Sequence, residues 1–331
     1  MKKKLFSIMM LFMVLITAGC GEKRKQEAAD DVVVRVGSLK GPTSIGLVFL
    51  MNEAKNNNTV NHYDEFMIKT AADELNTLFV KNELDIILIP ANVAGVLYHK
   101  TEGGVTVVDI NTLGVLYMVS ADNSVTDIPS LKGKTIYLTG KGTTPDYVLQ
   151  YLLEENGVNA ADVRLEYKSE AAEIAAVLSE NPDAIGLLPQ PFVTTACAQN
   201  DKLSVILDLT AEWEKVQGEE GGQLVTGVTV VRNAFLEEHP QAVEQFVKEH
   251  KDSMAFVETD LETAAGYVVE LGIIPKVEIA KAAIPNCNIV CVTGEDMKVS
   301  LESYLQVLFD KNSSAVGGAM PGDDFYYLGG D

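Results

Sequence analysis

Two short stretches combine glycine, proline and hydroxyl residues in a pattern that suits the binding of a small polar solute. "LKGPTS" spans Leu39–Ser44, and "GKGTTPD" spans Gly140–Asp146. Each follows a strand-like run and precedes a helix-like run, so each predicts a turn at a helix N-terminus, where backbone N–H groups lack partners. The hydroxyl residues of interest are Thr43, Ser44, Thr143 and Thr144. They could bind a ligand, or they could only cap the two helices. Asp146 could itself satisfy the second helix N-terminus.

Two further turns of the same form carry amide side chains. "IPANVAG" places Asn92, and "LLPQPFVTT" places Gln190, at strand-to-helix junctions. An amide both donates and accepts hydrogen bonds, which suits small polar ligands, but the same residues also favour turns and caps. Trp213 is the only tryptophan. It could stack on a planar ligand, or it could pack in the interior.

Motifs for catalysis, nucleotides and metals are missing from the sequence. Neither glycine-containing turn continues as a P-loop, and neither matches GxGxxG. The histidines at 62, 99, 239 and 250 do not have metal-ligand spacing, and we see no Ser-His-Asp or Cys-His arrangement. We therefore expect no cofactor, no metal site and no catalytic residues.

Charge and the N-terminal leader indicate the compartment. The 331 residues carry a formal net charge of -21, which argues against nucleic acid and against adhesion to anionic lipid. Lys2–Lys4 precede an apolar run, Leu5–Ile16, and "ITAGC" then leads to Cys20. This is a signal peptide, predicted over residues 1–19 and followed by a polar tether over residues 20–31. Outside the leader, the sequence predicts no membrane span.

The three cysteines after Cys20 do not form a disulfide framework, because their number is odd. Cys287 and Cys291 could close a small bridge, or they could be buried free thiols. Neither has a neighbouring histidine that would favour catalysis.

Strand-like and helix-like runs alternate from Val32 onward, which predicts an α/β fold with parallel-type sheets. A second set of alternating runs lies between the two halves of the first set. The chain is therefore expected to cross into a second unit near Val115–Ser120 and to return near Val225–Val231. We therefore predict a two-lobe fold of two doubly wound domains, joined by two crossover strands around a cleft. Lobe 1 is predicted over residues 32–116 and 228–331, and lobe 2 over residues 117–227. Clefts between domains are preferred ligand sites.

The pattern resembles a known family over nearly all of Val32–Leu328. The segments that carry the resemblance are "VTGVTVVRNAFLEEHPQAVEQFVKEH", "LKGKTIYLTGKGTTPDYVLQYLLEENG", "SLKGPTSIGLVFL" and "DIILIPANVAGVL". They resemble type 2 periplasmic binding proteins of the SsuA-like group, which are substrate-binding lipoproteins of ABC importers for sulfonates, nitrate and thiamine pyrimidine precursors. The leader resembles a lipoprotein signal, with Cys20 as the lipidated residue; plain secretion is the alternative.

The resemblance implies a capture protein and not an enzyme. The four turns would line the pocket through Thr43, Ser44, Asn92, Thr143, Thr144 and Gln190. The partners would be a small-molecule ligand, the permease and ATPase subunits of the importer, and the membrane through the lipid anchor only. The protein would be a monomer at the outer face of the cell membrane or in the periplasm.

The ligand and the function class have alternatives. A sulfonate or carboxylate would be bound mainly by N–H groups and hydroxyls, with Lys40 and Lys141 as the nearby cations. A planar heterocycle would use Asn92 and Gln190 together with an aromatic such as Trp213 or Tyr117. The alternative functions are an enzyme on the same two-lobe fold acting on a small metabolite, and a lipoprotein that senses or adheres.

Overall fold

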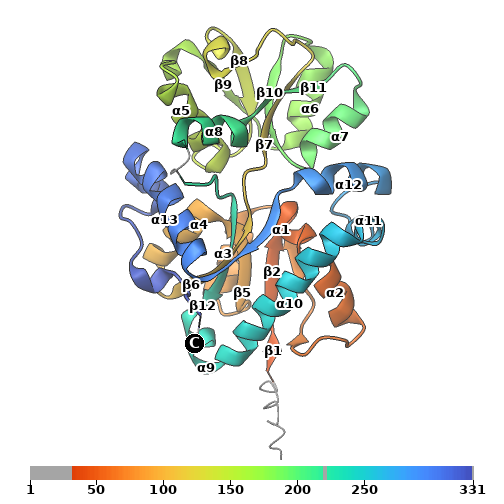
Figure 1. Cartoon of the computed structure of the whole chain (residues 1–331), viewed down its shortest axis with the longest axis vertical. Helices are drawn as coiled ribbons and strands as arrows, with labels where there is room; N and C mark the ends of the chain where they lie inside the picture. The colour runs from red at the N-terminus through yellow and green to blue at the C-terminus, as the bar shows by residue number, and fades with distance from the viewer. Residues whose placement is uncertain (1–31, 219–221, 330–331) are drawn as a thin grey trace, which may run out of the picture.

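Two β-sheets, one above the other in Figure 1, organise the chain into two lobes. The structure is a computed structural model that describes residues 32–218 and 222–329. The predicted leader, the tether and Cys20 lie outside the described residues. Within those ranges, no helix has the length and apolar character needed to cross a membrane.

The sheet of lobe 1 has the order β13-β6-β12-β5-β2-β4. Its strands are β2 (Val36–Leu39), β4 (Met67–Lys69), β5 (Ile86–Pro90), β6 (Val105–Thr112), β12 (Gly227–Arg232) and β13 (Ile289–Val292). Strands β4, β2 and β5 are parallel, whereas β12 runs antiparallel between β5 and β6. All of β6 and nearly all of β5 are buried, as continuous apolar runs covered on both faces should be. Beneath this sheet, β1 (Val33–Val34) pairs with β3 (His62–Tyr63).

The sheet of lobe 2 repeats this arrangement with the order β11-β7-β10-β8-β9. Its strands are β7 (Leu116–Ser120), β8 (Thr135–Leu138), β9 (Arg164–Tyr167), β10 (Ile185–Pro189) and β11 (Ser204–Asp208). Strands β9, β8 and β10 are parallel, and β7 runs antiparallel between β10 and β11. The lobe 2 sheet therefore contains one reversed strand, β7, whereas the lobe 1 sheet contains two: β12, which returns the chain to lobe 1, and the edge strand β13, which is antiparallel to β6.

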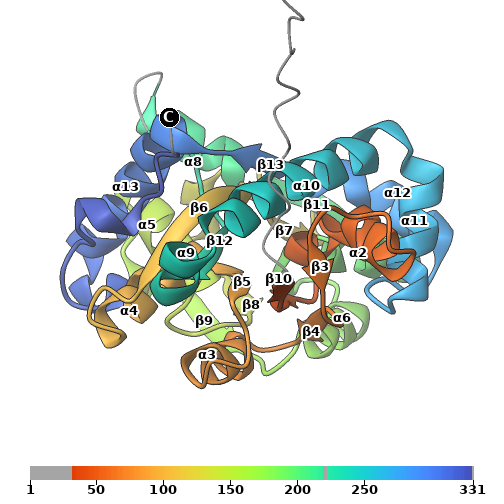
Figure 2. The same cartoon turned by 90° about the horizontal axis from the view of Figure 1, so that it is seen from below.

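Helices cover the faces of both sheets (Figures 1 and 2). In lobe 1 they are α1 (Pro42–Ile45), α2 (Val48–Lys55), α3 (Ala72–Val80), α4 (Ala91–Lys100), α9 (Asn233–Glu238), α10 (Pro240–Thr259), α11 (Leu261–Glu270), α12 (Val277–Ala283) and α13 (Gly294–Lys311). In lobe 2 they are α5 (Thr144–Glu155), α6 (Ala171–Glu180), α7 (Phe192–Gln199) and α8 (Leu209–Gln217). Short 3₁₀ turns are η1 (Ile128–Leu131), η2 (Ala160–Asp162), η3 (Ile284–Asn286), η4 (Ser313–Val316) and η5 (Asp323–Phe325).

The sequence predicts a helix over Ile45–Lys55 and a mostly helical chain from His239 onward, and the structure differs from both expectations. The helix expected at Ile45–Lys55 is divided into α1 and α2, because the chain turns at Gly46–Leu47. Strand β13 lies in a region expected to be mostly helical. Its β-branched residues pair with the outer edge of β6.

A buried polar chain braces the two neighbouring strands β6 and β12. The Asn111 amide donates to the Thr229 hydroxyl (3.1 Å), and that hydroxyl donates to Asp109 (2.7 Å). Asp109 also contacts Nδ1 of His250 on α10 at 3.2 Å. All four side chains are essentially inaccessible to solvent. The pairing of β6 with β12 shifts register at two places, and the polar chain fills this irregular region.

An ion-pair cluster joins three neighbouring strands at the opposite end of the same sheet. Asp85, buried at the start of β5, accepts from the guanidinium groups of Arg35 (2.6 and 2.8 Å) and Arg232 (2.6 Å). The neighbouring carboxylate raises the pKa of Arg35, although burial opposes this rise. The cluster ties together the chain before β2, the start of β5 and the end of β12, and it therefore fixes the frame that positions the strand ends above it.

We predict that Asp85→Ala lowers the free energy of unfolding by about 2–3 kcal/mol, less than the about 3–5 kcal/mol typical of a fully buried pair, because both arginines retain some access to water. Urea unfolding followed by circular dichroism would measure the change. Glu83→Ala, at an exposed neighbouring position, is the control and should stay within about 0.5 kcal/mol of the wild type. Equal effects of the two substitutions would show that the cluster does not hold the frame.

Candidate functional site

The first predicted turn joins β2 to α1 at the edge of the lobe 1 sheet. Gly41 has φ of 142°, a backbone conformation that other residues rarely adopt. The hydroxyls of Thr43 and Ser44 both donate to the carbonyl of Leu39, at 2.8 and 2.6 Å. These hydroxyls therefore stabilise the turn. Toward a ligand they can still offer lone pairs, but each proton is already used.

Gly227 lets the start of β12 approach this turn closely. A Cβ atom at position 227 would lie 2.6 Å from Oδ1 of Asn111 and 3.0 Å from Cγ2 of Thr43. The first turn is thus packed directly against the end of β6 and the returning strand β12.

The equivalent turn of lobe 2 joins β8 to α5, and its helix N-terminus is already occupied by a carboxylate. Asp146 is buried and accepts hydrogen bonds from Gly142 N (2.7 Å), Gln150 Nε2 (2.6 Å) and the Tyr167 hydroxyl (2.7 Å). Thr143 donates to the carbonyl of Gly140 at 2.6 Å. Asp146 thus lies in the first turn of α5 and binds the turn that precedes it, so a second anion at this helix end would meet its charge.

Two predicted residues from opposite lobes contact each other. The hydroxyl of Thr144, at the start of α5, donates to Oδ1 of Asn92, at the start of α4, at 3.1 Å. The Asn92 amide donates in turn to the carbonyl of Ala315 at 3.3 Å. Both side chains are buried. The strand-end turns of β5 and β8, which belong to different sheets, therefore meet at the lobe boundary.

Gln190 lies at the end of β10 and is buried. Its Oε1 accepts from the Thr194 hydroxyl at 2.9 Å, and its backbone N–H donates to the carbonyl of Val115, next to β7. The Gln190–Pro191 peptide bond is cis. The side-chain acceptor is thus engaged within lobe 2, whereas the amide NH₂ group has no hydrogen bond within the described residues.

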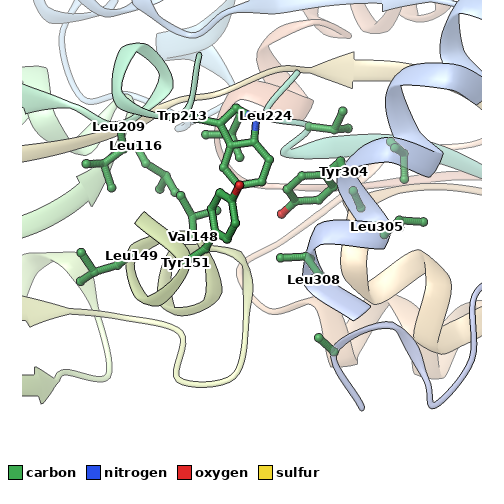
Figure 3. Close-up of a cluster of buried hydrophobic side chains, with 14 of the residues drawn as sticks. Leu116, Val148, Leu149, Tyr151, Leu209, Trp213, Leu224, Tyr304, Leu305 and Leu308 are labelled. Atoms are coloured by element: carbon green, nitrogen blue, oxygen red, sulfur yellow. The ribbon is translucent and has the colours of Figure 1, made fainter. Parts of the chain in front are cut away.

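Trp213 packs in the interior and is not exposed for stacking on a planar ligand (Figure 3). It is fully buried, its Nε1–H donates to the carbonyl of Gly222 at 2.7 Å, and its ring packs between Tyr151 of α5 and Tyr304 of α13. No face of the indole is open to a ligand in this structure. We therefore do not retain Trp213 among the candidate site residues, because it serves as interlobe packing.

Tyr117 is the alternative aromatic candidate. It lies on β7 next to the lobe boundary, partly buried. Burial raises the pKa of its phenol to about 12, with further contributions from the charges of Asp208 and Cys287. Its hydroxyl is therefore a neutral donor and acceptor at pH 7.

Sequence reasoning missed one pair of cations and one phenol. Lys69 ends β4 and Lys168 follows β9, so they occupy equivalent strand ends in the two lobes. Lys168 lies over the Tyr137 ring (5.5 Å), as Lys141 lies over the Tyr167 ring (5.4 Å). The signal that could have found them is the similarity of "IKTAADEL" to "YKSEAAEI". The missed phenol is that of Tyr304 on α13, whose ring packs against Trp213.

The described residues offer no group of three or more His, Cys, Asp or Glu side chains arranged to hold a metal ion. Cys197, Cys287 and Cys291 are free thiols. Burial raises the pKa of Cys287 to about 12, and burial together with the Asp109 charge raises that of Cys291 to about 12. Such thiols are protonated and poorly nucleophilic at neutral pH.

Comparisons with known proteins agree with this architecture. The family model described as menaquinone biosynthesis matches residues 42–283. No curated protein matches the chain.

Solved structures with the same fold include an ABC transporter protein from Parabacteroides distasonis (TM-score 0.73, 21% identity, 89% of this chain and 98% of that one). The periplasmic aliphatic sulphonate binding protein SsuA from Escherichia coli is also similar (TM-score 0.69, 13% identity, 86% of this chain and 93% of that one). A third is a ligand-binding component of an ABC-type import system from Staphylococcus aureus, with zinc bound (TM-score 0.67, 15% identity, 89% of this chain and 96% of that one). The predicted fold class, and the resemblance to the SsuA-like group at the level of fold, are confirmed.

We predict that Trp213→Ala lowers the free energy of unfolding by about 3–5 kcal/mol, because it leaves a large cavity between the two tyrosines. The matched control is Val205→Ala at an exposed position of β11, which should change stability by less than about 0.5 kcal/mol. Thermal and urea unfolding would measure both. A Trp213→Ala protein as stable as the wild type would mean that the indole is not part of the interlobe packing.

Proposed function

The chain belongs to the menaquinone biosynthesis family, and from its fold and its lobe boundary we propose that it is an extracytoplasmic solute-binding protein of an ABC importer. It would capture a small polar or planar solute between its lobes and deliver it to the permease and ATPase subunits. The observation that carries this proposal is the contact between Asn92 and Thr144, which joins strand-end turns of the two lobes. Ligands of open α/β sheets bind at the carboxyl ends of the strands.

The same contact suggests how binding would be linked to closure. A ligand shifts an equilibrium between open and closed lobes only by its difference in affinity for the two forms. Polar groups that approach each other only when the lobes are closed provide such a difference. We infer that the solute binds beside Asn92 and Thr144, with Thr43, Ser44, Thr143 and Gln190 around it.

Local hydrogen bonds narrow the chemistry of this proposed pocket. The hydroxyls at 43, 44 and 143 donate to turn carbonyls, so they would present acceptor lone pairs. The Gln190 amide and the Tyr117 phenol would supply donors, and the tyrosine would replace Trp213 as the aromatic contact for a planar solute. A sulfonate or carboxylate would depend instead on backbone N–H groups and on Lys40, Lys69, Lys141 or Lys168 at the strand ends.

The remaining features of the proposal concern location and organisation. We infer that the leader is removed after residue 19, that Cys20 is lipidated, and that residues 20–31 are a tether. The protein would lie at the outer face of the cell membrane or in the periplasm. The lobes would comprise residues 32–116 with 228–331, and residues 117–227. The protein would act as a monomer without a cofactor, and it would not bind nucleic acid.

An enzyme acting on a small metabolite is the second candidate, because the matching family is described by a biosynthetic role. The described residues provide one acid–base pair that could be considered, Asp109 with His250, but it is buried beneath the strand ends and bonded into the brace of β6 and β12. Mass spectrometry separates the two functions. A captured solute should be recovered unchanged after incubation, whereas a product of altered mass would favour the enzyme.

The solute would be identified by native mass spectrometry of the purified protein and by melting temperature against a library of sulfonates, carboxylates and heterocycles. With that solute, Asn92→Ala and Thr144→Val should each weaken binding about three- to tenfold, the equivalent of one hydrogen bond of about 0.5–1.5 kcal/mol. Thr77→Val is the matched control, because its exposed hydroxyl bonds only the Asp73 carbonyl within α3; it should have little effect on affinity. Isothermal titration would measure the affinities. Equal affinities in all three variants would show that these turns do not contact the solute.

The anchor is tested separately. Cys20→Ala should release the protein from the membrane fraction, or leave its leader uncleaved, without changing solute affinity, because Cys20 is not among the residues proposed to contact the solute. Fractionation and immunoblotting of cells that express the two forms would measure this. A Cys20→Ala protein that is processed normally and stays in the membrane fraction would reject lipidation at Cys20.

A further inference from the structure

The first crossing between the lobes is bound by a single residue of lobe 1. Strands β6 and β7 leave only residues 113–115 between the two sheets. The Leu113 N–H donates to the carbonyl of Asn288 at 3.0 Å, and the Asn288 side-chain amide donates to the carbonyl of Gly114 at 3.1 Å. Asn288 therefore binds both ends of the Leu113–Gly114 segment.

The sheet of lobe 1 places Asn288 in this position. The residue directly precedes β13, and Ile289, the first residue of that strand, pairs with Thr112 at the end of β6. Asn288 has φ of 45°, in the left-handed region, which asparagine adopts more readily than most other side chains. This conformation brings the backbone carbonyl and the side-chain amide of one residue to the same crossing.

Lobe 2 binds the crossing one residue later. The carbonyl of Val115 accepts from the backbone N–H of Gln190 at 3.0 Å. Gly114 lies against the start of α8, because a Cβ atom at position 114 would lie 2.1 Å from Oγ1 of Thr210. The segment is thus bonded to lobe 1 up to the Gly114 carbonyl and to lobe 2 from the Val115 carbonyl.

The second crossing is bound more loosely. Thr226 pairs through its backbone with Thr112 and Ala91 of lobe 1, whereas the Gly222 carbonyl accepts from Trp213 of lobe 2. Residues 223–225 separate these two attachments. The first crossing, where the attachments are adjacent, therefore defines the position of the hinge more narrowly than the second.

We propose that Asn288 is a positioning residue of the hinge and confines its first pivot to Val115. Because a peptide group is planar, holding the Gly114 carbonyl fixes the chain as far as the Val115 nitrogen. The next peptide group, which contains the Val115 carbonyl, moves with lobe 2. Rotation between the lobes then falls on φ and ψ of Val115, the residue to which Gln190 is bonded.

This inference rests on the proposed function, because closure matters if a solute is captured beside Gln190. The pivot itself is a property of the ligand-free protein. Without the side-chain bond of Asn288, the Gly114 peptide gains freedom in the open form, whereas contacts between the lobes still restrict it in the closed form. The lost constraint should raise the ratio of open to closed molecules about fivefold, which corresponds to about 1 kcal/mol.

The single tryptophan provides a probe that needs no solute. The Trp213 ring packs against Tyr151 of lobe 2 and Tyr304 of α13, so separation of the lobes at this place exposes one face of the indole (Figure 3). Acrylamide quenching of its fluorescence therefore follows the open fraction.

The test compares ligand-free wild type with Asn288→Gly and Asn57→Gly. Glycine at position 288 keeps the left-handed backbone and the backbone carbonyl, and it removes only the side-chain donor. Quenching should increase as the open ratio rises about fivefold. Asn57, exposed and with φ of 57°, is the matched control for an asparagine-to-glycine change at such a backbone position, and its variant should quench as the wild type does.

Amide exchange followed by NMR separates a loosened hinge from a general loss of stability. In Asn288→Gly, the Leu113 amide should exchange faster while the amides of β5 keep their protection. Equal acceleration at both places would show that Asn288 serves only stability, and would overturn the proposal. Should Asn288→Gly fail to fold in a thermal melt, Asn288→Asp replaces it, because aspartate keeps the size of the side chain and removes the same donor.

Unchanged quenching in a folded Asn288 variant, or an equal increase in Asn57→Gly, would also reject the role of Asn288. If the wild type nevertheless captures a solute unchanged, the proposed function stands without this hinge residue. Increased quenching in the Asn288 variant alone, together with conversion of the solute to a product of altered mass, would support the hinge residue and reject the proposed capture function.

Discussion

The antiparallel insertion of β12 between β5 and β6 is the constraint on which the rest of the structure depends. This strand returns from lobe 2, and its first residue, Gly227, pairs with Pro90 on one side and Thr112 on the other. The end of β5 therefore lies beside the start of β12, and the turn that carries Asn92 is fixed by the same pairing. Strand β7 does the same for lobe 2, between β10 and β11. Each sheet thus has a reversed strand inserted between two others, and so the two crossings and the strand-end turns form one assembly.

Two kinds of interaction hold this assembly. At the start of β5, the carboxylate of Asp85 joins Arg35, which precedes β2, and Arg232, which ends β12. Nearer the boundary, the chain from Asn111 to His250 fills the irregular pairing of β6 with β12. Across the boundary, Thr144 donates to Asn92. Trp213 of lobe 2 packs against Tyr304 of α13 (Figure 3). Polar groups set the orientation of the turns, and apolar packing keeps α13 against lobe 2.

The sequence predicts well what depends on local pattern. The apolar runs of β5 and β6, the strand-to-helix turns and the cap at Asp146 follow from residue type and spacing, and so does the nested two-lobe order. It predicts poorly what depends on how the lobes meet. The burial of Trp213 requires α13 of lobe 1 to pack against lobe 2, and no local pattern indicates this. The pairing of Asn92 with Thr144 joins residues far apart in the chain, although both were chosen individually. Strand β13 was missed because its short run becomes a strand only against the edge of β6.

The central claim is that one solute contacts the strand-end turns of both lobes at once. Hydrogen exchange of the backbone amides, measured with and without the identified solute, tests it most directly, because exchange reports local opening at each turn. We predict that the amides of residues 41–45 and 142–147 become protected together, with the same dependence on solute concentration. Protection confined to one lobe, or confined to a surface outside both turns, would contradict the account.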